Sequence, residues 1–171
     1  VSVHLNPLLV VKESHVGQGR RVFVDVIGAR PSLSLGGRAT EYGPAAKITL
    51  NPEELAQTIR ASVSDSLKLK GFAIAKREDQ AQRSLLVRVN DLRYRQRVGF
   101  VTGAIDINAS FEAQATNARG KKFDRIYRYH ADQNILFTPA ASEDARHVNK
   151  VLSVTLSKLV NDKQLILFLQ R

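Results

Sequence analysis

Arginines and tyrosines gather in two stretches of the chain, and together these side chains could bind a single-stranded nucleic acid. Arginine neutralises phosphate groups, and an aromatic ring stacks on a base. A sheet that carries both on one face can therefore hold a nucleotide strand. The residues with this chemistry are Arg93, Arg95, Arg97, Arg125 and Arg128, together with Tyr94, Tyr127 and Tyr129.

The spacing of these residues separates the two chemistries. Both stretches are expected strands, and successive side chains of a strand point to opposite faces. Tyr94 therefore points away from Arg93 and Arg95, and the tyrosines on either side of Arg128 point away from it. We interpret the tyrosines as core and most of the arginines as a solvent-facing surface. This favours a protein, lipid or glycan partner over nucleic acid.

The histidines are too scattered in the sequence to predict a metal site. His130 precedes Asp132 by two residues and His147 follows Glu143 by one helical turn, so each pair supplies two ligands at most. Zinc sites generally use three or four protein ligands. We therefore expect surface histidines and neither a metal nor another cofactor.

The sequence carries no signature of a catalytic centre. The acid pairs Glu53-Glu54 and Glu143-Asp144 stand at expected helix starts, where the helix dipole accounts for them. Gly36-Gly37 is not followed by the Lys-Ser/Thr of a phosphate-binding loop. No serine stands in a nucleophile elbow, so we expect a protein that is not an enzyme.

The composition indicates a globular protein with a strong positive charge. Apolar residues make up 43% of the 171 residues, charged residues make up 25%, and there is no cysteine. The lack of cysteine excludes disulfides, thiolate nucleophiles and thiolate metal ligands. The formal net charge of +10 favours long-range attraction to anionic partners, although no basic tail gathers that charge.

Residues 101–116 alternate between apolar and polar side chains, which is the pattern of a strand buried on one face. A second alternating stretch, residues 123–131, follows a turn at 117–121, so the two predict a long, one-sided hairpin. Registers with Ser110 or Glu112 opposite Arg128 both keep the apolar residues on one face. The second adds an ion pair worth only about 0 to 1 kcal/mol, so both registers stay open.

Caps and periodicity predict the remaining elements. Asn51-Pro52 marks a helix start, and basic residues followed by Gly71 mark its end. The phase of the apolar residues changes near Asn90-Asp91, which predicts a β-bulge. Residues 30–45 contain prolines and glycines without clear periodicity and are expected to be the longest loop and the best candidate for mobility. Expected strands also cover 21–27, 46–50, 72–75 and 85–100, and expected helices cover 52–70, 142–161 and a short final segment capped by Asp162.

These elements follow the order β-β-α-β-β-β-β-α, which lacks the strict alternation of a doubly wound fold. The order predicts an α+β fold with a largely antiparallel sheet and two main helices packed on one face. Residues 1–19 are expected to form an extended arm that ends in the flexible joint Gly17-Gln18-Gly19, and residues 20–171 a single domain. No stretch approaches the roughly 20 apolar residues of a membrane span.

The beginning of the chain predicts processing. The sequence starts at Val1 and contains no methionine, so we expect the start residue of the gene product to lie upstream. Residues 1–11 lack the apolar core and cleavage site of a signal peptide. Any targeting segment or anchor is therefore expected before Val1, with residues 1–19 as its tether.

Several segments together carry a family resemblance. They are VSV at 1–3 with Pro7, VFVDVIGAR at 22–30, LKGF at 69–72, LLVRVNDLRY at 85–94, the alternating hairpin and the terminal helix that closes on Phe168. In these segments the chain resembles the small YajG-like lipoproteins of Gram-negative bacteria. The resemblance implies a signal peptide, a lipidated cysteine shortly before Val1, and a periplasmic domain tethered to the outer membrane. It brings no active-site residues with it.

The sequence therefore predicts a non-catalytic periplasmic domain of an outer-membrane lipoprotein that binds an envelope protein or an anionic envelope component. We expect membrane contact only through the N-terminal lipid anchor, and single-stranded nucleic-acid binding by the sheet is the alternative. The candidate partner surface combines the segment 30–45 with exposed arginines. Its residues are Arg30, Arg38, Arg93, Arg95, Arg97 and Arg128.

Overall fold

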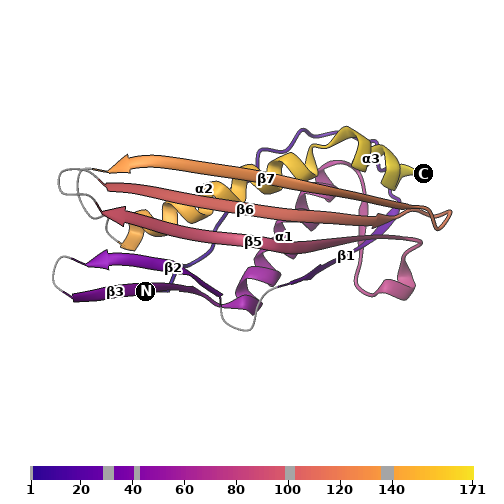
Figure 1. Cartoon of the computed structure of the whole chain (residues 1–171). Helices are drawn as coiled ribbons and strands as arrows, with labels where there is room; N and C mark the ends of the chain where they lie inside the picture. Colours follow the sequence, from indigo (N-terminus) through magenta and orange to yellow (C-terminus); the bar gives the residue numbers. More distant parts are fainter. Residues whose placement is uncertain (1, 29–32, 41–42, 99–102, 136–140) are drawn as a thin grey trace.

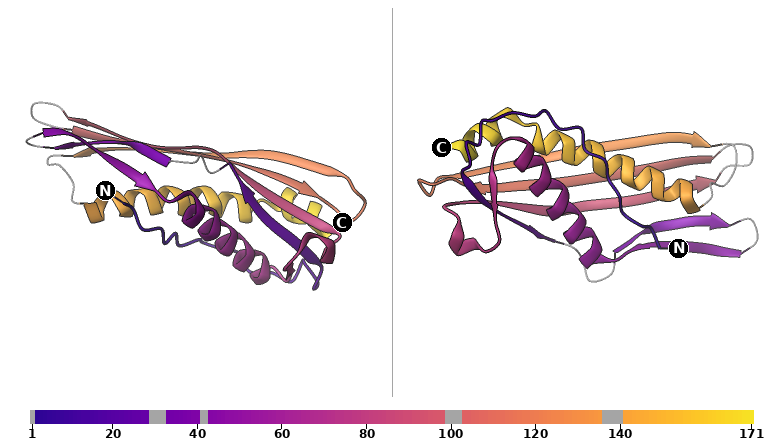
Figure 2. Two further views of the ribbon diagram at one scale, coloured as in Figure 1. Left: turned by 90° about the horizontal axis from the view of Figure 1, so that it is seen from below. Right: turned by 180° about the vertical axis from the view of Figure 1, so that it is seen from behind.

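The computed structural model describes residues 2–28, 33–40, 43–98, 103–135 and 141–171. It has two layers, a long twisted sheet and a layer of helices (Figure 1). The helices all lie on the same side of the sheet, and no helix of the described residues covers the opposite face (Figure 2). The predicted packing of the main helices on one face is therefore confirmed.

The strands form one large and one small sheet. They are β1 (Arg21–Ile27), β2 (Leu33–Thr40), β3 (Gly43–Leu50), β4 (Ala73–Ala75), β5 (Arg83–Val98), β6 (Gly103–Thr116) and β7 (Lys122–Ile135). The large sheet has the order β4-β1-β5-β6-β7, and β2 pairs with β3 in the small one. β2 also runs beside β5, beyond the end of β1 (Figure 1).

The large sheet is mixed, which corrects the expectation of a largely antiparallel sheet. β5, β6 and β7 are antiparallel neighbours, but β1 pairs in parallel with both β4 and β5. Parallel neighbours need a crossover connection, and the chain between β1 and β4 includes the long helix α1 (Pro52–Leu69). Periodicity indicates which face of a strand is buried and leaves the direction of its neighbours undetermined, so the sequence could not predict this pairing.

Most of the predicted loop 30–45 is strand, which is a second correction. The order of the main elements is β-β-β-α-β-β-β-β-α-α in the described residues. Pairing of β2 with β3 shifts register between Ser34 and Gly36 and again between Arg38 and Thr40, so a steady two-residue period never develops. Gly36 has a φ of +149°, and a Cβ there would lie 1.7 Å from the carbonyl oxygen of Tyr94. This glycine therefore allows β2 to approach β5 closely.

The predicted hairpin and bulge are confirmed. β6 and β7 pair with Ser110 opposite Arg128, one of the two registers that keep the apolar residues on one face. Glu112 instead lies opposite Arg88 of β5, with 3.8 Å between Glu112 Oε2 and Arg88 Nε. The pairing of β5 with β6 skips Asn90, where the phase of the apolar residues changes.

The helices begin and end at the predicted signals. The side chain of Asn51 accepts hydrogen bonds from two backbone amides in the first turn of α1, and the helix ends before Gly71, which has a φ of +84°. Asp162 caps the last helix through the backbone amide of Gln164. The other helices are α2 (Ala141–Val160), α3 (Lys163–Gln170) and the short 3-10 helix η1 (Glu78–Gln80).

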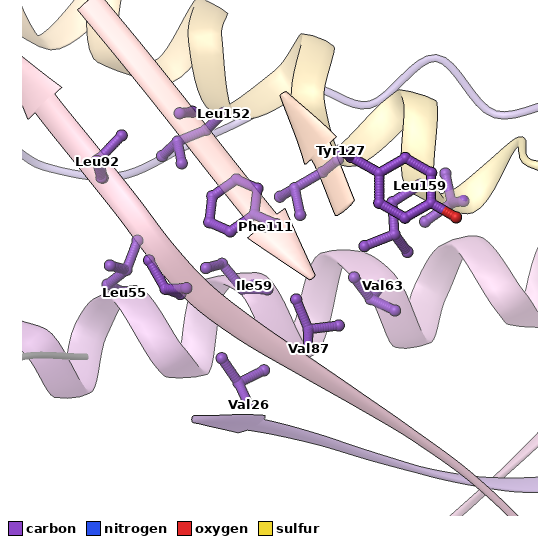
Figure 3. Packing of buried hydrophobic residues seen from close by; sticks show 14 of the residues in the cluster. Val26, Leu55, Ile59, Val63, Val87, Leu92, Phe111, Tyr127, Leu152 and Leu159 are labelled. Atoms are coloured by element: carbon purple, nitrogen blue, oxygen red, sulfur yellow. The ribbon is translucent and has the colours of Figure 1, made fainter. Parts of the chain in front are cut away.

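The core lies between the helices and the apolar face of the sheet. Phe111 of β6 is fully buried, between Leu152 of α2 and Ile59 of α1 (Figure 3). Leu92 of β5 and Tyr127 of β7 continue the same layer on either side of β6. From residue 105 onward, every second side chain of β6 is buried, as the alternation predicts.

The N-terminal arm lies extended along α2 and is hydrogen-bonded to it (Figure 2). Alternate backbone amides of the arm donate to side chains of α2 and of Asn161, the residue after it, at four-residue spacing, and we call these contacts the arm ladder. They run from Asn6 N to Asn149 Oδ1 (2.7 Å), Leu8 N to Ser153 Oγ (2.8 Å), Val10 N to Ser157 Oγ (3.0 Å) and Lys12 N to Asn161 Oδ1 (2.9 Å). At the start of the arm, Val3 and Leu5 are buried in the core.

The glycines at the end of the arm form a hydrogen-bonded turn. Gly17 N donates to Lys70 O at 2.9 Å, and Gly19 N donates to Gly71 O at 2.7 Å. A Cβ at Gly17 would lie only 2.5 Å from the carbonyl carbon of Gly71. The segment that the sequence predicts as a flexible joint is therefore held tightly against the end of α1.

The double change Ser153→Ala and Ser157→Ala should loosen the arm without unfolding the domain. Each lost hydrogen bond contributes about 0.5 to 1.5 kcal/mol, and the core under the helices is untouched. Amide hydrogen exchange measured by NMR should show faster exchange at Leu8 and Val10. The matched control Ser62→Ala, a serine of α1, should leave both amides unchanged. Equal protection of these amides in the double variant and the wild type would contradict a role for the arm ladder.

Candidate functional site

The bulge in β5 turns a row of arginines to the open face of the sheet. Buried residues of β5 are odd-numbered before Asn90 and even-numbered after it, so the odd-numbered side chains beyond the bulge point away from the helices. Arg93, Arg95 and Arg97 are exposed on this face, and Arg128 of β7 is exposed on it as well. We call these four residues the arginine face. Figure 1 views the molecule from this side, with the strands in front of the helices.

The structure brings together four of the six predicted partner-surface residues. Arg38 lies on β2, which runs beside β5, and Arg30 lies outside the described residues. Strand register places Arg93, Arg95 and Arg128 in cross-strand rows with polar residues of β6, whereas Arg97 lies opposite Ala104. The rows are Asp91–Ser110–Arg128, Arg93–Asn108–His130 and Arg95–Asp106–Asp132.

Carboxylates neutralise only part of this charge. Arg93 Nε lies 2.7 Å from Asp91 Oδ1. Among the described residues, no carboxylate lies within ion-pair distance of Arg95, Arg97 or Arg128. The exposed pairs that do form contribute about 0 to 1 kcal/mol each, so they orient side chains more than they stabilise the fold.

A shallow hollow of about 630 Å³ opens between the first two rows. Arg93, Arg128 and His130 line it together with Asp91, the ion-pair partner of Arg93, and the small side chain of Ser110 lies between the rows. His130 Nδ1 lies 2.9 Å from Asn108 Oδ1 and 3.6 Å from Asp106 Oδ1. Two guanidinium groups and an imidazole can bind an oxyanion by charge-assisted hydrogen bonds. The hollow is therefore a candidate site for a phosphate or carboxylate group of a partner.

The tyrosines lie on the other side of the sheet, as predicted. Tyr94 is 1% exposed, and its hydroxyl donates to Asp144 Oδ1 at 2.5 Å. The Tyr127 hydroxyl donates to Asp162 Oδ2 at 2.6 Å, and burial together with this carboxylate raises the pKa of Tyr127. Within the described residues the arginine face thus lacks the stacked aromatic rings that single-stranded nucleic acids require, which weakens the nucleic-acid alternative.

Arg125 belongs to a structural cluster and not to the arginine face. Its Nη1 lies 2.7 Å from Asp162 Oδ2, and its Nη2 also donates to the side chain of Gln164. Arg125 shares the parity of Tyr127, so the two side chains lie on the helix side of β7. Parity in the sequence therefore predicts the face on which Arg125 lies, but its partners Asp162 and Gln164 come from a distant segment, which periodicity does not locate.

The histidines stay apart from any cluster of metal ligands. In the ranges that the structure describes, no three His, Asp or Glu side chains are arranged to hold a metal ion. His147 lies on α2, where burial and the charge of Arg146 lower its pKa. None of the described helices combines the length and apolar character that a membrane crossing needs.

A family model described as uncharacterized lipoprotein matches residues 7–170. No curated protein sequence matches the chain.

Several solved structures are similar to this chain at low sequence identity. A protein from Xanthomonas campestris is similar over 93% of this chain and 90% of its own, with a TM-score of 0.56 and 11% identity. A minor lipoprotein from Acinetobacter baumannii matches over 86% of this chain and 89% of its own, with a TM-score of 0.43 and 9% identity. An uncharacterized lipoprotein B from Nitrosomonas europaea matches over 93% and 88%, with a TM-score of 0.42 and 8% identity. The first likeness shows a shared fold.

Proposed function

The chain belongs to the uncharacterized lipoprotein family, and from this premise we propose that it is a lipid-anchored domain that binds a partner through the arginine face. The domain stands in the periplasm, tethered to the outer membrane by a lipidated segment ahead of residues 1–19. It acts by binding and not by catalysis. Its partner is an envelope protein or another envelope component that presents anionic groups.

The observation that carries this proposal is that carboxylates compensate only part of the charge of the arginine face. Arg95, Arg97 and Arg128 are exposed and have no carboxylate partner among the described residues. Their strands lie on a sheet surface that no described helix covers (Figure 2). Arginine forms planar, bidentate hydrogen bonds with carboxylates and phosphates, so an anionic partner can replace water at these side chains.

The long strands suit this role because they hold the arginines in fixed register. Arg93 is oriented by Asp91 at 2.7 Å, and Arg128 stands two strands away across Ser110. Binding groups on packed strands lose less conformational freedom than groups on loops. The face therefore presents a preorganised pattern of charge to its partner.

Site-specific photo-cross-linking in the periplasm of cells that make the full-length lipoprotein tests this function. A cross-linking residue at Asp132, an exposed position beside the arginine face, should give one dominant adduct. The same residue at Gln57, an exposed position on α1, serves as the control and should not give that adduct. The double charge reversal Arg95→Glu and Arg128→Glu should reduce the Asp132 adduct by about tenfold.

Each failure in this experiment counts against the proposal. No adduct at Asp132, or the same adduct at Gln57, would show that the partner does not contact the arginine face. An adduct that the charge reversal leaves undiminished would show that the arginines do not recognise it. The alternative, binding of single-stranded nucleic acid, is tested by fluorescence anisotropy with labelled single-stranded nucleic acid at low and high salt. Binding that weakens steeply with salt would favour that alternative.

A further inference from the structure

A buried lysine stands at the end of α1, away from the arginine face. Lys70 is 5% exposed, and its Nζ donates to the backbone oxygen of Lys12 at 2.6 Å and to Asn161 Oδ1 at 3.3 Å. Among the described residues no carboxylate lies within ion-pair distance of this ammonium group. An ammonium has three N–H donors, so two neutral acceptors leave one donor for another group.

Burial of this charge is unfavourable unless an anion compensates it. Burial, and then the charge of Lys12, lower the pKa of Lys70, which is the expected response of an ammonium without a counter-ion. Natural cores rarely keep a lysine of this kind without a partner. Lys70 also lines an open space in which an anion can compensate its charge.

A cavity of about 260 Å³ adjoins Lys70, between the end of the arm and α3. Val16, Ile166 and Leu167 supply an apolar wall, and Leu167 is 46% exposed at that surface. The charged residues that line the cavity besides Lys70 are Lys12, Lys163 and Glu13. The surroundings are therefore apolar with a net positive charge, and the most deeply buried of the charges is Lys70.

We propose that this cavity binds a medium-chain fatty acid, with its carboxylate on Lys70 Nζ and its acyl chain against Ile166 and Leu167. A monoanionic carboxylate matches a single remaining donor, whereas a phosphate would need several donors to replace its hydration. An acyl chain removes the apolar wall from water. This proposal is independent of the arginine face and of its partner.

Isothermal titration calorimetry with decanoate, below its micelle concentration, tests the site on the whole chain. Decanoate should bind the wild type with one-to-one stoichiometry. Lys70→Met keeps the aliphatic stem and removes the charge, so decanoate should bind it at least about tenfold more weakly. Decanol has the same chain without a carboxylate and should bind the wild type more weakly than decanoate does. Its affinity should differ by less than about twofold between the wild type and Lys70→Met.

The matched control is Lys68→Met, two residues away on the same helix end. Lys68 is exposed and pairs with Asp65 at 3.2 Å, so its loss should not change decanoate binding. A second variant, Leu167→Glu, alters an exposed position of the cavity wall and should abolish decanoate binding even if Lys70→Met fails to fold. No decanoate binding by the wild type, equal losses for decanol and decanoate in Lys70→Met, or undiminished binding by Leu167→Glu would each overturn the proposal.

Discussion

Replacing Phe111 with alanine should lower the free energy of unfolding by about 3 to 5 kcal/mol. Phe111 is fully buried at the centre of β6, between β5 and β7 in the sheet order. Its ring lies between Leu152 and Ile59 (Figure 3), so truncation leaves a cavity walled by both helices. Such walls relax only partly, and the loss of contacts adds to the loss of apolar burial. Urea denaturation followed by circular dichroism measures the effect.

The neighbouring residue provides the control for this prediction. Glu112 follows Phe111 on the same strand and points to the open face, where it pairs with Arg88. Glu112→Ala should cost less than about 1 kcal/mol, because a partly exposed ion pair contributes little. Equal losses at the two positions would contradict a sheet that is buried on one face only.

The sequence predicts well those features that depend on near neighbours in the chain. The burial of Phe111, the bulge at Asn90 and the helix start at Asn51 each follow from residues within a few positions of one another. The direction of the strands does not follow from near neighbours, because β1 pairs with β4 and β5 only after the crossover that includes α1. The sequence does not reveal β2, because register shifts at Ser34–Gly36 and Arg38–Thr40 interrupt the two-residue period of a strand.

The same distinction holds for the candidate sites, because near neighbours in the chain predict only part of each site and distant segments supply the rest. Parity alone placed Arg93 and Arg128 on one face, but their hollow exists because strand register puts Ser110 between them. In the sequence Lys70 is an ordinary basic residue at a helix end, where a lysine complements the helix dipole. Its burial depends on the arm and on Asn161, which lie 58 and 91 residues away. The sequence does contain one sign of where the arm lies, because the side chains that accept its hydrogen bonds recur every four residues. They are Asn149, Ser153, Ser157 and Asn161.

Replacing Asp162 with alanine should cost about 2 to 4 kcal/mol at neutral pH. Asp162 caps α3 through the amide of Gln164 at 2.9 Å. Its other carboxylate oxygen accepts hydrogen bonds from Tyr127 at 2.6 Å and from Arg125 at 2.7 Å. The alanine variant therefore loses a helix cap and leaves the partly buried tyrosine hydroxyl without its acceptor. Urea denaturation of both proteins gives the difference in unfolding free energy.

The same carboxylate makes this difference depend on pH. Burial alone would raise the pKa of Asp162, but the hydrogen bonds from Tyr127, from the Gln164 amide and from Arg125 outweigh burial and hold the pKa below its ordinary value of 3.8. The folded state therefore binds fewer protons than the unfolded state, so the stabilisation is complete above that value and is lost as the pH falls through the lower pKa of the folded state. The difference in unfolding free energy between wild type and Asp162→Ala should narrow in acid below pH 3.8.

The control is Asp124→Ala, at an exposed position of the same strand as Tyr127, which should show no such difference from wild type at neutral pH. A constant gap for Asp162→Ala from neutral to acid pH would mean that its loss acts through packing and not through the charge.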